Sequence, residues 1–154
     1  MSIIENINAY EILDSRGIPT LLTQVILDNG VKGYAAVPSG ASTGIHEALE
    51  LRDKDKNRYN GKGVLNNIDF INSLILDALQ GLEIRDQKNI DSILLKLDGT
   101  KNKSKLGANT LLSVSLAVAK TASNLNKVDL YQYLGGINTN LLPCLLYTSP
   151  SPRD

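Results

Sequence analysis

The sequence predicts an α+β domain in which a three-stranded antiparallel meander is followed by a helical bundle. Extended, β-branched and apolar segments separated by two turn signals fill residues 3–37. From residue 64 onward, apolar residues recur at the 3-, 4- and 7-residue spacing of helices. Because the strands come first and the helices afterwards, the order favours an α+β domain over alternating β-α-β units.

We expect the three strands over residues 3–13, 20–27 and 31–37. Residues 14–19, Asp-Ser-Arg-Gly-Ile-Pro, predict a turn, since Gly permits a positive φ and Pro restricts φ. In the second strand, alternate apolar residues and Thr23 share one face. Asn29-Gly30 then predicts a hairpin with a type I′ turn, in which both central residues take positive φ.

Four helices are expected in the rest of the chain. The first covers residues 64–79 and ends near Gly81, and the second is capped by Asp86 and ends at Asp98-Gly99. The third, over residues 108–125, is rich in small and apolar residues and is expected to be buried on most sides. Residues 129–134 form a short last helix. Between the strands and these helices, residues 46–52 could form one or two helical turns, and residues 53–63 are an exposed loop.

Composition restricts the classes of function. The 154 residues carry 16 basic and 16 acidic side chains, and this balance argues against a dedicated nucleic-acid binder. A single cysteine, Cys144, excludes a disulfide within the chain. No apolar stretch approaches the length of a membrane span, and the N-terminus lacks the features of a signal peptide, so we expect a cytoplasmic protein.

The segment best suited to bind a ligand is Ser39-Gly40-Ala41-Ser42-Thr43-Gly44. Its hydroxyls and unobstructed backbone N–H groups could approach a phosphate or Mg²⁺, which prefers oxygen ligands. It is not a P-loop, because Ile45 stands where Lys would be required. On composition alone, an ordinary flexible surface loop is the alternative.

The other candidates are weaker. His46, the only histidine, is typical of a surface or capping residue, and Asp14 and Arg16 could pair across a structural turn. Three lysines between residues 101 and 105 are expected to form a solvated loop. The residues therefore contain no self-sufficient catalytic set, and the chain could be the non-catalytic partner of an active site completed elsewhere.

Several segments, in order and spacing, together resemble the N-terminal domain of enolase (phosphopyruvate hydratase). The resemblance extends over about residues 3–143, and any one of the motifs would be weak alone. The matching segments are residues 14–17 with 19–20, 37–44, 46–53, 61–64, 97–100, 102–109, 114–117 and 130–131.

The resemblance implies a fold and an activity. In that family the domain is a three-stranded meander packed on helices, and the enzyme reversibly dehydrates 2-phosphoglycerate to phosphoenolpyruvate in glycolysis. It also implies that a Lys base and a Glu acid act with Mg²⁺, which stabilises an enediolate. Those groups belong to a C-terminal barrel that is absent from this chain.

Some site residues carry over from the resemblance. Residues 39–44 correspond to the family's mobile substrate lid, and Ser42 resembles the ligand of a second Mg²⁺ through its hydroxyl and carbonyl oxygens. Asp14 and Arg16 lie near the subunit contact of the family's homodimer. Leu22 departs from the pattern, because an acidic residue that helps subunit pairing is usual there.

The end of the chain departs most. We expect residues 1–143 to form the domain, and residues 144–154 resemble a translated transposon-type sequencing adapter, so we interpret them as an artefactual tail. A genuine Pro-rich tail is the alternative. For function, the fragment of an enolase, inactive by itself, competes with a stand-alone interaction module and with another enolase-superfamily chemistry.

Overall fold

The computed structural model describes residues 2–38, 40, 44, 47–136 and 139. The strands are β1 (Ile4–Leu13), β2 (Pro19–Leu27) and β3 (Lys32–Val37). They form one antiparallel sheet in the order β1-β2-β3, in which Tyr10 lies opposite Leu22 and Leu22 opposite Ala36. The predicted meander is therefore confirmed, with each strand boundary within one residue of its expected place.

Both hairpins of the meander close through three-residue loops. The N–H of Gly17 donates to the carbonyl of Asp14 and the N–H of Gly30 to that of Leu27, both at 2.9 Å. The two glycines have φ of 73° and 81°, whereas Asn29 is not among the residues with positive φ. The hairpin at Asn29-Gly30 is confirmed, but the type I′ turn is wrong. Asp28 joins the loop, so only the final glycine has to adopt the left-handed conformation.

The predicted helix over residues 64–79 is one continuous helical segment with a wide turn in its middle. It comprises α1 (Leu65–Phe70), the π-helical turn η2 (Ile71–Ile75) and α2 (Leu76–Leu79). Its buried residues Asn67, Ile71, Ile75 and Leu79 are four apart, and the wider turn keeps that spacing on one face. The apolar side chains of Leu65 and Leu74 on the same segment are exposed.

The remaining helices are α3 (Gln87–Asp98), α4 (Ala108–Asn126) and α5 (Leu130–Gly135). The Asp86 side chain caps α3 by accepting from the N–H of Asn89, and Gly99 ends the helix with φ of 67°, as expected. Burial raises the pKa of Asp98, but hydrogen bonds from the Thr100 hydroxyl and from the N–H groups of Leu106 and Thr100 outweigh it and lower that pKa. Asp98 thereby organises the loop after α3.

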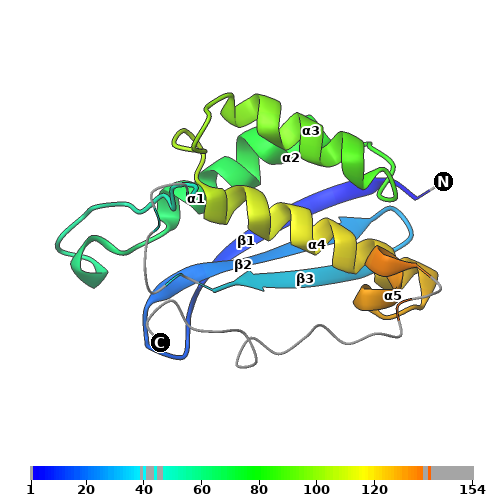
Figure 1. Cartoon of the computed structure of the whole chain (residues 1–154), viewed down its shortest axis with the longest axis horizontal. Coiled ribbons are helices and arrows are strands. Elements are labelled where there is room, and N and C mark those ends of the chain that lie inside the picture. Colours follow the sequence, from blue (N-terminus) through cyan, green and yellow to red (C-terminus); the bar gives the residue numbers. More distant parts are fainter. Residues whose placement is uncertain (1, 39, 41–43, 45–46, 137–138, 140–154) are drawn as a thin grey trace, which may run out of the picture.

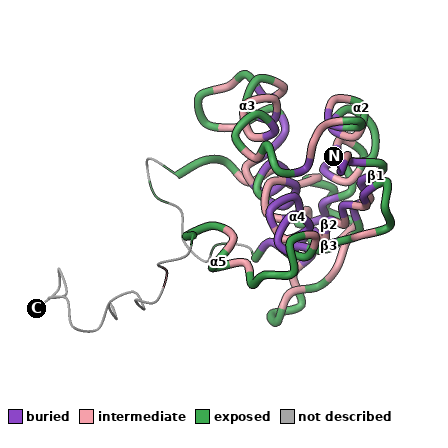
Figure 2. Tube along the Cα trace, turned by 90° about the vertical axis from the view of Figure 1, so that its right-hand side faces the viewer, coloured by how far each residue is buried: buried purple, intermediate pink, exposed green. Residues whose placement is uncertain are grey.

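Helix α4 crosses one face of the sheet and forms the centre of the core (Figure 1). Purple segments in Figure 2 run through α4 and the strands beneath it. Eleven of its residues are buried, as the small and apolar composition predicts. Gly33 lies directly under this helix, since a Cβ at that position would be 2.6 Å from the Thr121 nitrogen. Glycine in β3 is what permits such a close approach.

Residues 47–52 are not helical, which corrects the expectation of a helical turn there. Their backbone groups find partners elsewhere in the molecule. Leu49 donates to the carbonyl of Asn102 and accepts from the N–H of Ala108, both at 2.8 Å. Leu51 donates to the side chain of Asn109 at 3.1 Å. These tertiary bonds replace a helical ladder, so the segment has no regular secondary structure and is bound to the N-terminal end of α4.

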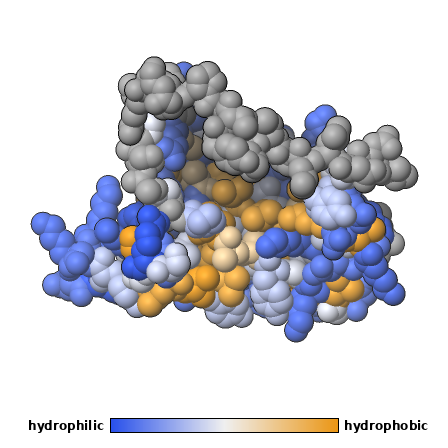
Figure 3. Space-filling model, turned by 60° about the horizontal axis from the view of Figure 1, so that its bottom comes forward, coloured by the Kyte–Doolittle hydropathy of each residue, from blue (hydrophilic) through white to orange (hydrophobic). Residues whose placement is uncertain are grey.

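The surface also carries apolar side chains, and Figure 3 shows them in the middle of one face between hydrophilic ends. None of the helices in the described ranges combines the length and hydropathy that a bilayer crossing requires. The expected tail at residues 144–154 lies outside the described residues.

Replacing Gly33 with Ala should destabilise the domain, because the added methyl would meet backbone atoms of α4. The free energy of unfolding should fall by about 1–3 kcal/mol, as measured by urea titration. Gly44→Ala is the matched control, since its added Cβ would meet nothing closer than 4.0 Å. Equal losses in the two variants would show that close packing under α4 is not the cause.

Candidate functional site

The candidate site lies around residues 39–44, of which the structure describes Gly40 and Gly44. The N–H of Gly40 donates to Oε1 of Glu50 at 3.2 Å. The N–H of Gly44 donates to Oε2 of Glu47 at 2.8 Å, and the N–H of Glu47 donates back to the carbonyl of Gly44 at 3.1 Å. Each described glycine is thus bound to a carboxylate. The expected site residues Ser39, Ala41, Ser42 and Thr43, together with His46, lie outside the described residues.

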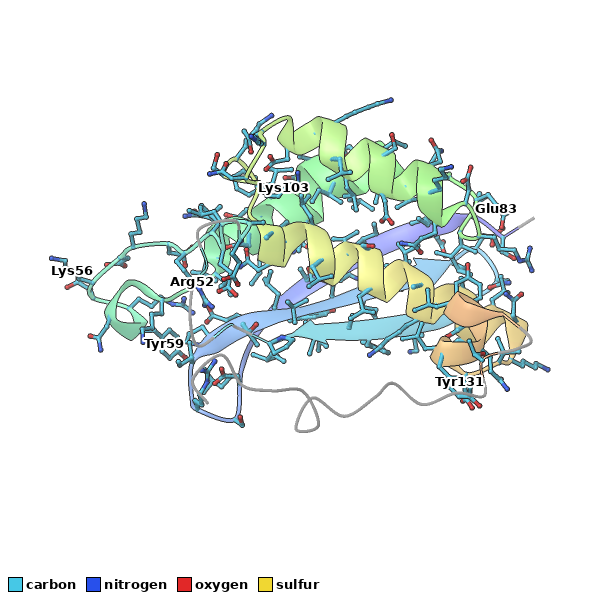
Figure 4. All side chains as sticks on the ribbon, in the orientation of Figure 1. Arg52, Lys56, Tyr59, Glu83, Lys103 and Tyr131 are labelled. Atoms are coloured by element: carbon cyan, nitrogen blue, oxygen red, sulfur yellow. The ribbon has the colours of Figure 1, made fainter. Side chains whose placement is uncertain are left out.

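Arg52 connects this region to the body of the domain. Its Nη2 donates to Oε2 of Glu50 at 3.1 Å, while Nη1 donates to the carbonyls of Pro19 and Lys62 at 2.6 and 2.8 Å. Pro19 begins β2, and Lys62 belongs to the loop before α1. The planar fork of a guanidinium suits such a set of converging oxygens. Figure 4 labels Arg52 where that loop meets the sheet.

A second arginine, Arg58, pairs with Glu11 on β1. The two guanidinium Nη atoms bind the two carboxylate oxygens, with Nη1 at 2.9 Å from Oε2. Glu11 also accepts from the N–H of Val64 at 3.1 Å. The bond from Arg58 is the main reason that the pKa of Glu11 lies below its ordinary value, although burial acts in the opposite direction. The pair attaches the loop to the sheet.

Asp53 caps the N-terminus of α1 from twelve residues away. Its Oδ2 accepts from the N–H of Leu65 at 2.8 Å, and its Oδ1 accepts from the N–H of Asn66 at 3.0 Å. These donors have no partner within the helix, and a carboxylate also suits the positive end of the helix dipole. Gly63 leaves room for this contact, since a Cβ there would lie 2.5 Å from Oδ2 of Asp53.

The loop over residues 53–63 was expected to be exposed, and residues 54–57, 59 and 60 are exposed in the structure. It contains the 3-10 turn η1 (Tyr59–Gly61). Lys54, Tyr59 and Asn60 take positive φ, which is uncommon for residues other than glycine. The guanidinium carbon of Arg58 lies 4.9 Å from the centroid of the Tyr59 ring. Figure 4 shows the loop projecting from the domain, with Lys56 at its tip and Tyr59 nearer the sheet.

Two buried side-chain amides, one on α4 and one on α1, connect residues 47–52 to these helices. Asn109 of α4 accepts from the N–H of Leu51 and donates to its carbonyl, both at 3.1 Å. Asn67 of α1 donates to Oδ1 of Asn109 at 3.3 Å and to Oγ1 of Thr110 at 2.7 Å. Because buried polar groups are costly when unpaired, these bonds determine the position of this segment.

Asp14 and Arg16 do form the pair that the sequence suggested, with Nη2 of Arg16 3.1 Å from Oδ2 of Asp14. The N–H of Ile18 is the largest cause of a lowered pKa at Asp14, followed by bonds from Arg16. The pair belongs to the β1–β2 turn. Its role in a subunit contact stays a prediction.

The three lysines between residues 101 and 105 are only partly the solvated set that was expected. Lys105 donates from Nζ to the carbonyl of Leu97 at 2.9 Å, in the last turn of α3. There it satisfies a terminal carbonyl and complements the negative end of the helix dipole.

No group of three or more His, Cys, Asp or Glu side chains capable of holding a metal occurs among the described residues. The nearby carboxylates are engaged by arginine or backbone N–H groups: Glu11 by Arg58, Glu50 by Arg52, and Asp53 by the start of α1. The geometry holds Gly40 to Glu50, which Arg52 binds in turn, and holds Gly44 to its near neighbour Glu47. Seryl hydroxyl and carbonyl oxygens are chemically suited to Mg²⁺, but Ser42, the expected ligand, lies outside the described residues.

Sequence reasoning missed Glu50, Arg52, Glu11, Arg58 and Asp53 as parts of this region. Each acts on a partner that no local motif specifies. The only usable signal was the density of charged residues between 47 and 58, which by itself is typical of a solvated loop.

The family model described as "Enolase, N-terminal domain" matches residues 4–134. The match includes β1 through most of α5, and therefore every element described above except the last residue of α5.

Replacing Asp53 with Ala should destabilise the domain, because two N–H groups at the start of α1 lose their acceptor. We expect the free energy of unfolding to fall by about 1–2 kcal/mol in urea titrations. Asp69→Ala, an exposed position on the same helix, provides the control. An equal effect at both positions would exclude capping as the cause.

The stability of the domain should fall as the pH falls below about 5. Glu11, Asp14 and Asp98 have lowered pKa values in the folded state, so the unfolded state binds more protons in this range. Their stabilisation is present above the unfolded pKa values and is lost as the pH falls through the folded ones. Glu11→Gln should reduce the dependence of unfolding free energy on pH, measured at intervals from 7 to 3, with exposed Glu5→Gln as control. An unchanged slope in Glu11→Gln would contradict this assignment.

Proposed function

Because this chain belongs to the enolase N-terminal domain family, we propose that it supplies the N-terminal part of an enolase, the lyase that interconverts 2-phosphoglycerate and phosphoenolpyruvate. In this proposal residues 39–44 are the lid of the active site. The observation that carries it is the family match, and it is supported by the hydrogen bonds from the N–H groups of Gly40 and Gly44 to the carboxylates of Glu50 and Glu47.

Ser42 is the residue of the lid that we assign to chemistry. Its hydroxyl and carbonyl oxygens would bind Mg²⁺, and the bound cation would supply compensation for the negative charge that develops on the substrate. The backbone N–H groups and small side chains of the lid would exclude water from the substrate. The groups that transfer protons would come from the barrel domain, so we propose that this chain alone is inactive.

The complete enzyme is proposed to be a cytoplasmic homodimer. The turn with Asp14 and Arg16 is our candidate for part of the subunit contact. Arg16 supports this choice because its side chain is 44% exposed although it pairs with Asp14. Leu22, on the outer face of β2 and opposite Tyr10, is a second residue that such a contact would involve.

The proposal is tested by reconstitution. The purified chain alone should form no phosphoenolpyruvate from 2-phosphoglycerate, whereas mixing it with the separately purified barrel domain of an enolase, in the presence of Mg²⁺, should restore activity. Ser42→Ala should lower the restored kcat by about 100-fold, since a metal contact at the reacting charge contributes several kcal/mol. Ser104→Ala, an exposed serine in the loop before α4, is the matched control.

Two outcomes would contradict the proposal. Turnover by the chain alone would show that it contains its own catalytic base. Full restored activity with Ser42→Ala would remove that residue from the metal site. If no barrel domain restores activity and none is encoded downstream in the genome, the stand-alone interaction module becomes the better interpretation.

A further inference from the structure

The two glutamates that bind Gly40 and Gly44 differ in how they are held. Glu47 binds Gly44 three residues away through a reciprocal pair of hydrogen bonds, so this anchor is local. Glu50 binds Gly40 ten residues away and is itself bound by Arg52. Of these two anchors between described residues, the one at Glu50 connects Gly40 through Arg52 to more distant parts of the chain.

We propose that Glu50, held by Arg52, is a positioning residue that determines where the backbone of Gly40 lies relative to the sheet. This inference rests on the proposed function for its catalytic meaning, but its geometry stands without it. Glu50 uses one carboxylate oxygen for the N–H of Gly40 at 3.2 Å and the other for Nη2 of Arg52 at 3.1 Å. The carboxylate thus lies between backbone and guanidinium.

Arg52 is suited to this role because its own position is determined. Its Nη1 is shared between the carbonyls of Pro19 and Lys62, and its side chain is only 18% exposed. These carbonyls belong to the first residue of β2 and to the loop that Asp53 and Arg58 attach to the body of the domain. Arg52 therefore cannot follow a displacement of Glu50 without breaking its bonds to the sheet and to the loop.

The two glycines of the segment are therefore constrained differently. Its Gly40 end has a fixed position with respect to β2, whereas the Glu47 anchor constrains the Gly44 end only with respect to its own chain neighbours. Hydrogen bonds with an ionised partner are stronger than neutral ones, which suits the contact between Glu50 and the N–H of Gly40 to this role.

Backbone amide NMR of the purified chain tests the geometry without Mg²⁺, substrate or barrel. In Glu50→Gln the Gly40 amide proton should move upfield, and its hydrogen exchange should accelerate about three- to tenfold as a charged acceptor becomes neutral. Arg52→Lys should produce the same change at Gly40, because an ammonium cannot reproduce the fork. The amide of Ala108, which donates to the carbonyl of Leu49, should stay unchanged and report that the fold is intact.

Glu47→Gln is the matched control, and it should alter the Gly44 amide while leaving Gly40 unchanged. The inference is overturned if Gly40 does not respond to Glu50→Gln, or if both glutamate variants disturb the same amides. In the reconstituted enzyme, Glu50→Gln should lower kcat about tenfold, with a smaller effect on KM. If Glu50→Gln disturbs the Gly40 amide but leaves kcat unchanged, the positioning role is wrong. Failure of the proposed function is read separately, from Ser42→Ala.

Discussion

The packing of α4 against the sheet is the constraint on which the other parts of this domain depend. The helix approaches so closely that Gly33 has no room for a side chain, and Thr23 of β2 bonds Ser113 of α4 at 3.0 Å inside the core. The N-terminal end of α4 then provides Ala108 and Asn109, which bind residues 47–52. Core packing thereby determines where Glu47, Glu50 and Arg52 lie, and through them the position of the candidate site.

Local features of the fold could be predicted because their causes are local. The face of β2 that packs under α4, the Asp86 cap and the Gly99 end of α3 all follow from residues adjacent in sequence. The hairpin at Asn29-Gly30 was predicted for the right residues, and only its loop length was wrong. The motif resemblance also pointed to the family that the comparison shows.

The candidate site was less predictable, since its contacts join residues far apart in sequence. Glu11 and Arg58 are 47 residues apart, and Leu51 and Asn109 are 58 apart. Residues 46–52 have the composition of a helical turn, yet tertiary hydrogen bonds keep the described part of them out of a helix. Propensity is a weak prior where a buried amide such as Asn109 competes for the same backbone groups. The chemistry of residues 39–44 came from composition and resemblance alone.

The order of elements along the chain has a consequence for synthesis on the ribosome. The three strands are joined by three-residue loops, so the meander can form from the first 37 residues with low contact order. Its apolar face is covered by a helix that begins at Ala108, and the buried contact between Thr23 and Ser113 spans 90 residues. In a nascent chain the faces of β2 and β3 that α4 covers therefore stay exposed until α4 emerges from the exit tunnel. Transiently exposed apolar surface of this kind is prone to aggregation.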